Sequence, residues 1–162
     1  MVTELTILVG TMTGTAELVA EEVRDALAAA GHRVEMRVMD GLDAAAVTPG
    51  GAYLICTSTY GQGDVPDNAI AFYESLKAAR PSLAGMRYGV IALGDRTYKD
   101  TFCNGGRQFD ELLTELAAER VGEVMRHDAS AGTMPEEKGV EWAVAWIEEL
   151  ERQLGDSREA AA

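Results

Sequence analysis

The stretch that decides the fold is Leu5-Thr6-Ile7-Leu8-Val9-Gly10 followed by Thr11-Met12-Thr13-Gly14-Thr15-Ala16. The apolar run predicts a buried strand, and the helical pattern that begins near Glu17 predicts a helix capped by Thr13 or Thr15. A hydroxyl-rich loop between a strand and a helix makes an anion site, because free N–H groups and the positive end of the helix dipole converge there. The loop has no Lys or Arg, which favours a monoester phosphate over a nucleoside triphosphate. An ordinary capped turn remains the alternative.

Apolar runs and helical patterns alternate along the rest of the chain. Strands that alternate with helices predict a parallel sheet covered on both faces. We therefore predict an α/β fold with a doubly wound five-stranded parallel sheet, strand order 2-1-3-4-5, and helices on both faces. Residues 1–154 are expected to form one domain, with 155–162 as a frayed tail. The predicted strands span 5–10, 32–38, 51–57, 87–93 and 121–126, and the predicted helices span 17–30, 68–79, 106–118 and 136–154.

The chain is strongly acidic, with 27 acidic and 14 basic residues and a formal net charge of −13. This balance argues against nucleic acid and anionic membrane surfaces as partners, since both need a basic footprint, and it favours basic partners. Solubility alone would explain the acidity equally well. No apolar stretch approaches the roughly 20 residues of a membrane span, and we expect no signal peptide.

The cysteines and histidines predict no metal site and no disulfide. Cys56 and Cys103 lie far apart and outside any metal or C-x-x-C spacing, so we expect a reducing cytoplasm. Cys103 is interpreted as a small apolar filler because no basic partner is evident beside it. His32 and His127 are isolated in the sequence, and we expect both on the surface.

Two further loops lie where an open parallel sheet binds its ligands, beyond the carboxyl ends of the strands at the point where the strand order reverses. Residues 57–68 and 93–106 each follow a buried strand, and they carry Tyr60 and Tyr98 close to glycines. Tyrosines on two loops that flank one crevice could sandwich a planar ring, a contact worth roughly 0.5–1.5 kcal/mol beyond burial. For each loop alone, a glycine-rich turn with a tyrosine over the core edge is the alternative.

Together the three loops resemble those of the short-chain flavodoxins and of the FMN domains of diflavin reductases, and the chain looks most similar to the MioC type. The resemblance covers essentially the whole chain and implies a flavodoxin-like fold with FMN as the cofactor. By matching position, residues 11–16 would bind the FMN phosphate, and Tyr60 and Tyr98 would stack on the isoalloxazine. The Gly61 backbone would meet flavin N5, and Asp95 would lie at the pyrimidine end. The cofactor-binding residues so implied are Thr11, Met12, Thr13, Gly14, Thr15, Ala16, Ser58, Thr59, Tyr60, Gly61, Gln62, Gly63, Leu93, Gly94, Asp95, Tyr98, Phe102 and Cys103.

The resemblance implies an electron carrier and not an enzyme, in which the flavin does the redox chemistry. Carboxylates near the flavin, namely Asp64, Asp67 and Asp95, would disfavour its anionic reduced form, and Asp128 is a further candidate acid. We expect a monomer that receives electrons from an NADPH-dependent flavoprotein reductase and passes them to an acceptor enzyme with a basic face. The alternatives are a small FMN-dependent NAD(P)H or quinone oxidoreductase and a flavin-free interaction module.

Overall fold

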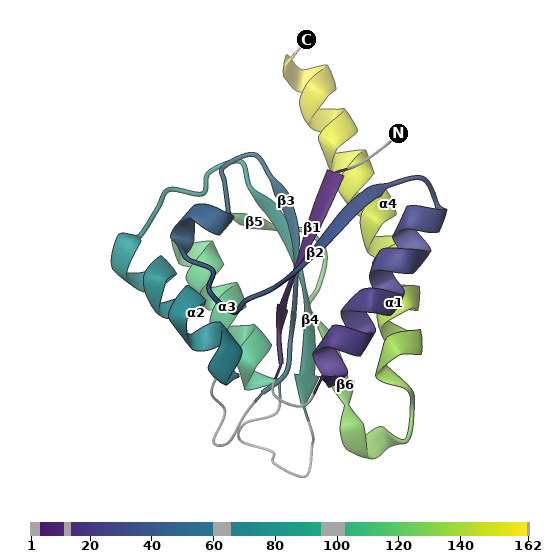
Figure 1. Ribbon diagram of the computed structural model, residues 1–162. Helices are drawn as coiled ribbons and strands as arrows, with labels where there is room; N and C mark the ends of the chain where they lie inside the picture. Colours follow the sequence, from purple (N-terminus) through teal and green to yellow (C-terminus); the bar gives the residue numbers. More distant parts are fainter. Residues whose placement is uncertain (1–3, 12–13, 60–65, 95–102, 162) are drawn as a thin grey trace.

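A single parallel sheet runs through the protein, whose computed structural model describes residues 4–11, 14–59, 66–94 and 103–161, with side chains as far as residue 155. The strands pair in the order β2-β1-β3-β4, and both β5 and β6 pair with β4 (Figure 1). The predicted fold class and strand order are therefore confirmed. The strands are β1 (Glu4–Gly10), β2 (Arg33–Val38), β3 (Ala52–Thr57), β4 (Arg87–Gly94), β5 (Glu119–Arg120) and β6 (Met125–Asp128).

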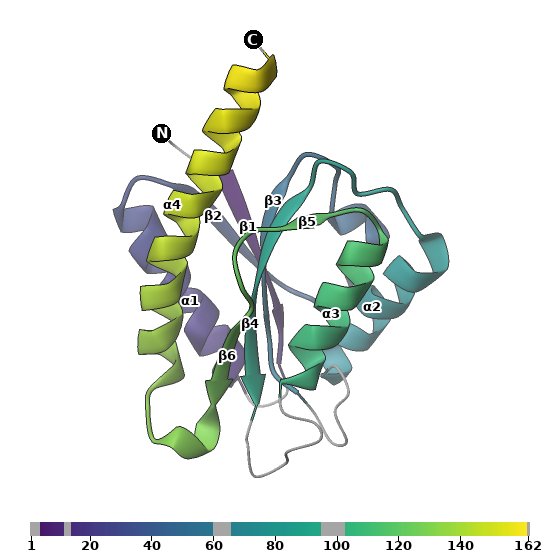
Figure 2. The same ribbon diagram turned by 180° about the vertical axis from the view of Figure 1, so that it is seen from behind.

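Two helices cover each face of the sheet (Figures 1 and 2). Helices α1 (Thr15–Ala29) and α4 (Pro135–Ala161) pack on one face, and α2 (Asp67–Ala79) and α3 (Asn104–Glu115) pack on the other. Each pair of helices buries its own apolar cluster against the strands, so β3 and β4 are apolar on both sides. The described residues also form two short 3₁₀ helices, η1 (Ala44–Ala46) and η3 (Ala129–Ala131).

The fifth strand position is occupied by two short strands, so the prediction of one strand over 121–126 is wrong in its centre. The Val121 amide still donates to the Tyr88 carbonyl (2.8 Å), as a strand residue would. The Val121 carbonyl instead accepts a hydrogen bond from the indole Nε1 of Trp146 (3.0 Å), and Gly122 then turns the chain with φ at +69°. A tertiary hydrogen bond therefore interrupts the ladder between β5 and β6.

The helix ends differ from the prediction at two places. The residue that caps α1 is Gly14 and not Thr13 or Thr15, because the helix already begins at Thr15. At the other end of the chain, α4 begins at Pro135 and continues to Ala161, where the sequence predicted an end at residue 154. No helix within the described ranges combines the length and the apolarity needed to cross a membrane.

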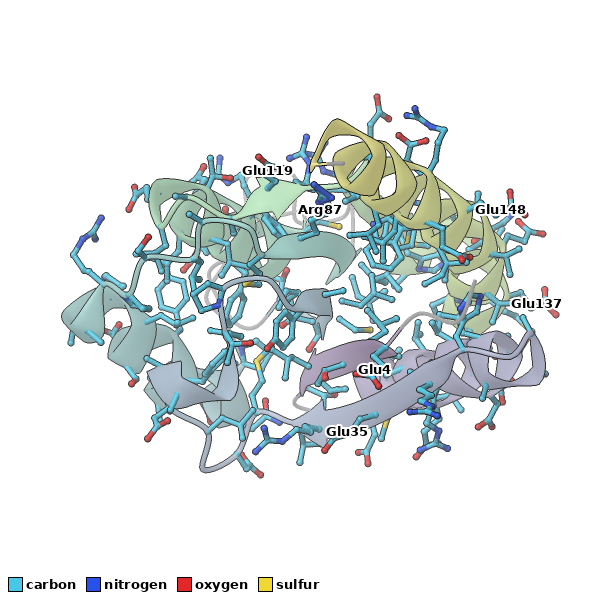
Figure 3. The ribbon with its side chains drawn as sticks, turned by 90° about the horizontal axis from the view of Figure 1, so that it is seen from above. Glu4, Glu35, Arg87, Glu119, Glu137 and Glu148 are labelled. Atoms are coloured by element: carbon cyan, nitrogen blue, oxygen red, sulfur yellow. The ribbon has the colours of Figure 1, made fainter. Side chains whose placement is uncertain are left out.

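Ion pairs link neighbouring strands at their amino ends. Figure 3 shows this end of the sheet from above. Arg33 of β2 reaches Glu4 of β1 (3.3 Å), and Arg87 of β4 reaches Glu119 of β5 (4.0 Å). Because all the strands are parallel, their carboxyl ends meet at the opposite edge of the sheet. That edge carries the loops that the sequence assigns to a ligand.

Candidate cofactor site

The loop between β1 and α1 is closed by a hydrogen bond to the hydroxyl group of Thr11. The Gly14 amide donates to Thr11 Oγ1 (2.9 Å), and Gly14 adopts a left-handed conformation (φ +92°) that other residues avoid. The amide of Leu18 donates to the Gly14 carbonyl (3.0 Å), so the amides before it point out of the end of α1. Ala16, the second residue of α1, is fully buried. This geometry suits an anion held by amides and hydroxyls.

An asparagine that sequence reasoning left without a role anchors the same loop. The Thr11 amide donates to Asn68 Oδ1 (2.8 Å), which joins the end of β1 to the first turn of α2. The Thr11 amide is therefore already satisfied within the protein. Asn68 belongs to the sequence Pro66-Asp67-Asn68 at the end of the second loop. Its contact with Thr11 spans 57 positions of the chain, so no local pattern in the sequence indicates it.

Thr59 joins the second loop to the third. Its hydroxyl donates to the Leu93 carbonyl at the end of β4 (3.1 Å) and accepts a hydrogen bond from the Gly105 amide at the start of α3 (3.0 Å). The neighbouring Ser58 amide donates to the Gly10 carbonyl (3.0 Å), which ties the end of β3 to the end of β1. One short segment therefore connects the carboxyl ends of three strands.

The loops at this edge approach one another through their backbones. A Cβ built on Gly105 would lie 2.4 Å from the Ser58 carbonyl oxygen, so only glycine allows this contact. Cys103 caps α3 in a left-handed conformation (φ 55°), and its buried Sγ donates to the Ala92 carbonyl (3.3 Å). Its burial agrees with the interpretation as an apolar filler.

Half of the implied cofactor residues lie outside the described residues, namely Met12, Thr13, Tyr60, Gly61, Gln62, Gly63, Asp95, Tyr98 and Phe102.

The prediction that His127 lies on the surface is wrong, since the residue is only 5% exposed. Alternation along β6 turns its ring towards the start of α4, where Nε2 lies 2.9 Å from Thr133 Oγ1. His127 and Thr133 line a cavity of about 250 Å³ together with Thr15 and Gly94, at the carboxyl edge of the sheet. Period-two alternation of the strand was the signal that would have found it.

The end of β6 and the segment after it therefore lie at the carboxyl edge of the sheet, although the sequence analysis gave almost none of these residues a role. The one candidate it supplied, Asp128, uses its carboxylate to accept hydrogen bonds from the amide (2.9 Å) and the hydroxyl (2.7 Å) of Ser130. Asp128 therefore acts as the cap of η3.

Cys56, at the end of β3, lies beneath the first loop. Full burial raises the pKa of its thiol to about 12, and the thiol donates a hydrogen bond to the Ala16 carbonyl (3.4 Å).

The described residues fit a flavin mononucleotide. The start of α1 and the hydroxyl of Thr11 can hold a phosphate without a cationic side chain, and the cavity lined by Thr15, Gly94 and His127 lies beside it. A doubly wound sheet with an anion site at this edge is typical of nucleotide-binding α/β proteins. The chain belongs to the flavodoxin family, whose sequence model, described as Flavodoxin, matches residues 7–142.

Individual relatives agree with this membership. Flavodoxin YqcA from Escherichia coli K12 is 43% identical over 143 residues, which is 88% of this chain and 95% of the relative. Protein MioC from the same strain is 33% identical over 89% of this chain and 96% of its own. The similarity to the MioC type is therefore confirmed, although YqcA is the more similar of these two relatives. The NADPH sulfite reductase flavoprotein alpha-component of Bacillus subtilis is 34% identical, over 95% of this chain and 25% of the larger protein.

Solved structures place the chain in the same family. A variant of the flavodoxin from Pseudomonas aeruginosa superimposes with a TM-score of 0.82 and 37% sequence identity, covering 92% of this chain and 99% of that one. The family and these neighbours identify FMN as the cofactor and electron transfer as the role of the protein.

Proposed function

We propose that this chain carries electrons from an NADPH-dependent flavoprotein reductase to an acceptor enzyme with a basic face. Similarity to one part of a protein named for NADPH and sulfite reduction supports a reductase as the donor. The net charge of −13 supports basic partners, because opposite charge speeds diffusional encounter. When bound, FMN supplies the one- and two-electron chemistry, and the protein orients it and limits access to it.

The observation that carries this proposal is the frame at the carboxyl edge of the sheet. Thr59 bonds to both Leu93 and Gly105, and Asn68 bonds to Thr11, so hydrogen bonds join the described residues at the ends of the three loops. In the proposed site the phosphate lies at the first turn of α1, where Thr11, Gly14, Thr15 and the backbone of Ala16 surround it. Ser58, Thr59, Leu93, Gly94 and Cys103 support the loops that flank the ring, and the tyrosines of those loops remain the proposed stacking partners.

Thr15→Val tests the phosphate loop. The variant should bind FMN more weakly by about 1.5–3 kcal/mol, roughly ten- to a hundredfold in Kd, because a hydrogen bond to a charged group is lost. Its affinity for riboflavin, which lacks the phosphate, should change far less. Thr6→Val, near the amino end of β1, is a matched control and should affect neither ligand. Equal losses for FMN and riboflavin in Thr15→Val would remove the loop from its proposed role.

The carrier role has a separate test. Reduction of the FMN-loaded protein by NADPH should require an added flavoprotein reductase, and its rate should fall as the ionic strength rises from about 0.01 to 0.5 M. Steady NADPH oxidation by the purified protein alone would instead favour a direct oxidoreductase. We further propose that the protein works as a monomer in the cytoplasm, where its two buried cysteine thiols would remain reduced.

A further inference from the structure

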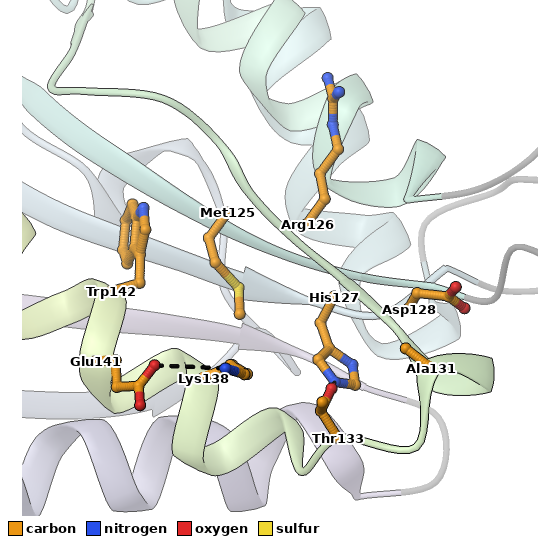
Figure 4. Close-up of a pocket in the computed structure, with 9 residues that line it drawn as sticks. All are labelled: Met125, Arg126, His127, Asp128, Ala131, Thr133, Lys138, Glu141 and Trp142. Atoms are coloured by element: carbon orange, nitrogen blue, oxygen red, sulfur yellow. Dashed lines mark hydrogen bonds and ion pairs between the residues drawn. The ribbon is translucent and has the colours of Figure 1, made fainter.

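A groove of about 520 Å³ runs between β6 and the first turns of α4, outside the loops of the candidate cofactor site (Figure 4). Met125 of β6 and Trp142 of α4 give it an apolar floor, and both side chains are half-buried. Trp142 stacks on Trp146, with ring centroids 5.9 Å apart and planes 21° apart. The stacking fixes the ring, and the part of it that stays exposed lines the groove.

A carboxylate stands at the rim of this aromatic floor. Glu141 precedes Trp142 on α4, and its side chain is 72% exposed. It pairs with Lys138 at 3.7 Å, but Lys138 is itself 49% exposed, and an exposed pair of this kind contributes little to stability. The order of the two residues, with Lys before Glu along the helix, is also the less favourable orientation. The carboxylate can therefore accept another cation.

An exposed indole beside an available carboxylate matches the chemistry of a guanidinium group. The planar cation stacks on an aromatic ring, where Trp is the best partner, and at the same time donates a forked pair of hydrogen bonds to a carboxylate. An ammonium group lacks the flat face and the fork. The aliphatic stem of an arginine side chain would cover the thioether of Met125.

The net charge of the chain favours a basic occupant of the groove. The charged residues that line the groove are the acidic Asp128 and Glu141 and the basic Arg126 and Lys138. The one arginine of the lining, Arg126, alternates to the other side of β6, and in Figure 4 its side chain leads away from Trp142 and Glu141. On a chain with a net charge of −13, the groove therefore combines an apolar floor with an exposed carboxylate, that of Glu141, at its rim.

We propose that this groove is a docking pocket for an arginine side chain on the surface of the redox partner, held by stacking on Trp142 and by hydrogen bonds to Glu141. The proposal rests on the proposed function in one respect, since it assumes that the partner of this electron carrier is basic. It adds a specific contact, outside the cofactor loops, that would fix the orientation of the partner.

The test uses a small probe in place of the partner. The FMN-loaded, ¹⁵N-labelled protein is titrated with the tripeptide acetyl-Gly-Arg-Gly-amide and, in parallel, with its citrulline analogue, which has the same shape without the charge. Binding should shift the indole N–H signal of Trp142 and the backbone signal of Glu141 in a saturable way. The citrulline analogue should bind about tenfold more weakly or not at all.

Four variants separate this pocket from general charge attraction. Glu141→Gln and Trp142→Leu should each weaken the arginine peptide about three- to tenfold. Lys138→Gln should strengthen binding about two- to threefold, since it removes the cation that competes for Glu141. Glu148→Gln is the matched control, an exposed carboxylate farther along α4 that Figure 3 labels, and it should leave the affinity unchanged.

Either of two results would overturn the proposal. One is equal binding of the arginine and citrulline peptides, and the other is a loss in Glu148→Gln as large as that in Glu141→Gln. Repeating the titration on the flavin-free protein separates the two proposals. A protein that fails to bind FMN but still discriminates arginine through Trp142 contradicts the carrier function alone.

Discussion

The indole of Trp146 on α4 packs directly against the backbone of Gly89 in β4. A Cβ built on Gly89 would lie 2.4 Å from Trp146 Nε1 and 2.7 Å from its Cε2, far inside contact distance. From this position the same Nε1 donates to the Val121 carbonyl (3.0 Å). The missing side chain at Gly89 thus lets one residue of the last helix reach across β4 and hold the break between β5 and β6.

Gly89→Ala should therefore destabilise the protein. The added methyl group displaces an indole that is nearly fully buried, and overpacking of this kind costs about 1–3 kcal/mol in the free energy of unfolding. Urea denaturation followed by circular dichroism measures the change. Gly155→Ala is the matched control, because nothing lies within 4 Å of its added Cβ and the residue is helical. The control should gain about 0.5–1 kcal/mol, and a gain in Gly89→Ala as well would contradict the steric account.

The region around Gly89 and Trp146 contains one part of the fold that could be predicted from the sequence and one part that could not. The strands over 52–57 and 87–94 were recognisable because a strand buried on both faces is an unbroken apolar run. The break at Val121 was not recognisable, because its cause is a hydrogen bond from a side chain 25 positions later. Local pattern finds an element, whereas its interruption depends on a residue that only the tertiary structure brings near.

Thr59→Val should both destabilise the protein and weaken FMN binding. The substitution leaves the Leu93 carbonyl and the Gly105 amide without the hydroxyl that joins them, and an unsatisfied buried group costs about 1–3 kcal/mol. Urea denaturation and FMN titration by fluorescence quenching measure the two effects. Thr59→Ser keeps the hydroxyl group and should stay close to the wild type in both assays. A loss in Thr59→Ser as large as that in Thr59→Val would mean that the hydroxyl group alone does not account for the effect.

The candidate site could be located from the sequence, but its internal bonds could not be predicted. Hydroxyl- and glycine-rich loops after three predicted strands were enough to mark the edge of the sheet. The bonds from Thr11 to Asn68 and from Thr59 to Leu93 span 57 and 34 positions, so neither has a local pattern. His127 was mistaken for a surface residue because the predicted strand ended at residue 126, so the alternation of the strand was not extended to it.

Ala117→Gly should stabilise the protein. Ala117 follows α3 in a left-handed conformation (φ 75°), where its amide bonds to the Thr114 carbonyl and the Ala118 amide bonds to the Leu113 carbonyl (3.0 Å each). Helices usually end in this way on glycine, since an L-residue loses about 1–2 kcal/mol there. Glycine has more conformational freedom in the unfolded chain, and losing it on folding costs roughly 0.5–1 kcal/mol. The free energy of unfolding is therefore expected to rise by about 0.5–1 kcal/mol in total.

Thermal and urea unfolding measure the effect of Ala117→Gly. Ala79→Gly, at the last helical residue of α2, is the matched control and should lose up to about 1 kcal/mol, because that residue is helical and has no left-handed strain to relieve. If both variants lose stability by the same amount, the conformation of Ala117 imposes no strain.

Alkaline pH should reveal the burial of Cys56. The thiol is fully buried in β3, and desolvation raises its pKa from 9.0 to about 12. Between these values the unfolded chain loses the thiol proton while the folded protein keeps it. The free energy of unfolding is therefore unaffected by this group below pH 9 and falls above it, by up to about 1.4 kcal/mol for each pH unit.

Urea unfolding under reducing conditions at pH 8, 9, 10 and 10.5 tests this for the wild type and Cys56→Ala. The variant should be less stable at every pH because it loses packed volume in the core. Its stability should nevertheless decline less steeply above pH 9, so the two curves converge. Burial also raises the pKa of Tyr88, but that residue is common to both proteins and cancels in the comparison. Parallel curves from pH 8 to 10.5 would show that the Cys56 thiol titrates alike in the folded and unfolded chains.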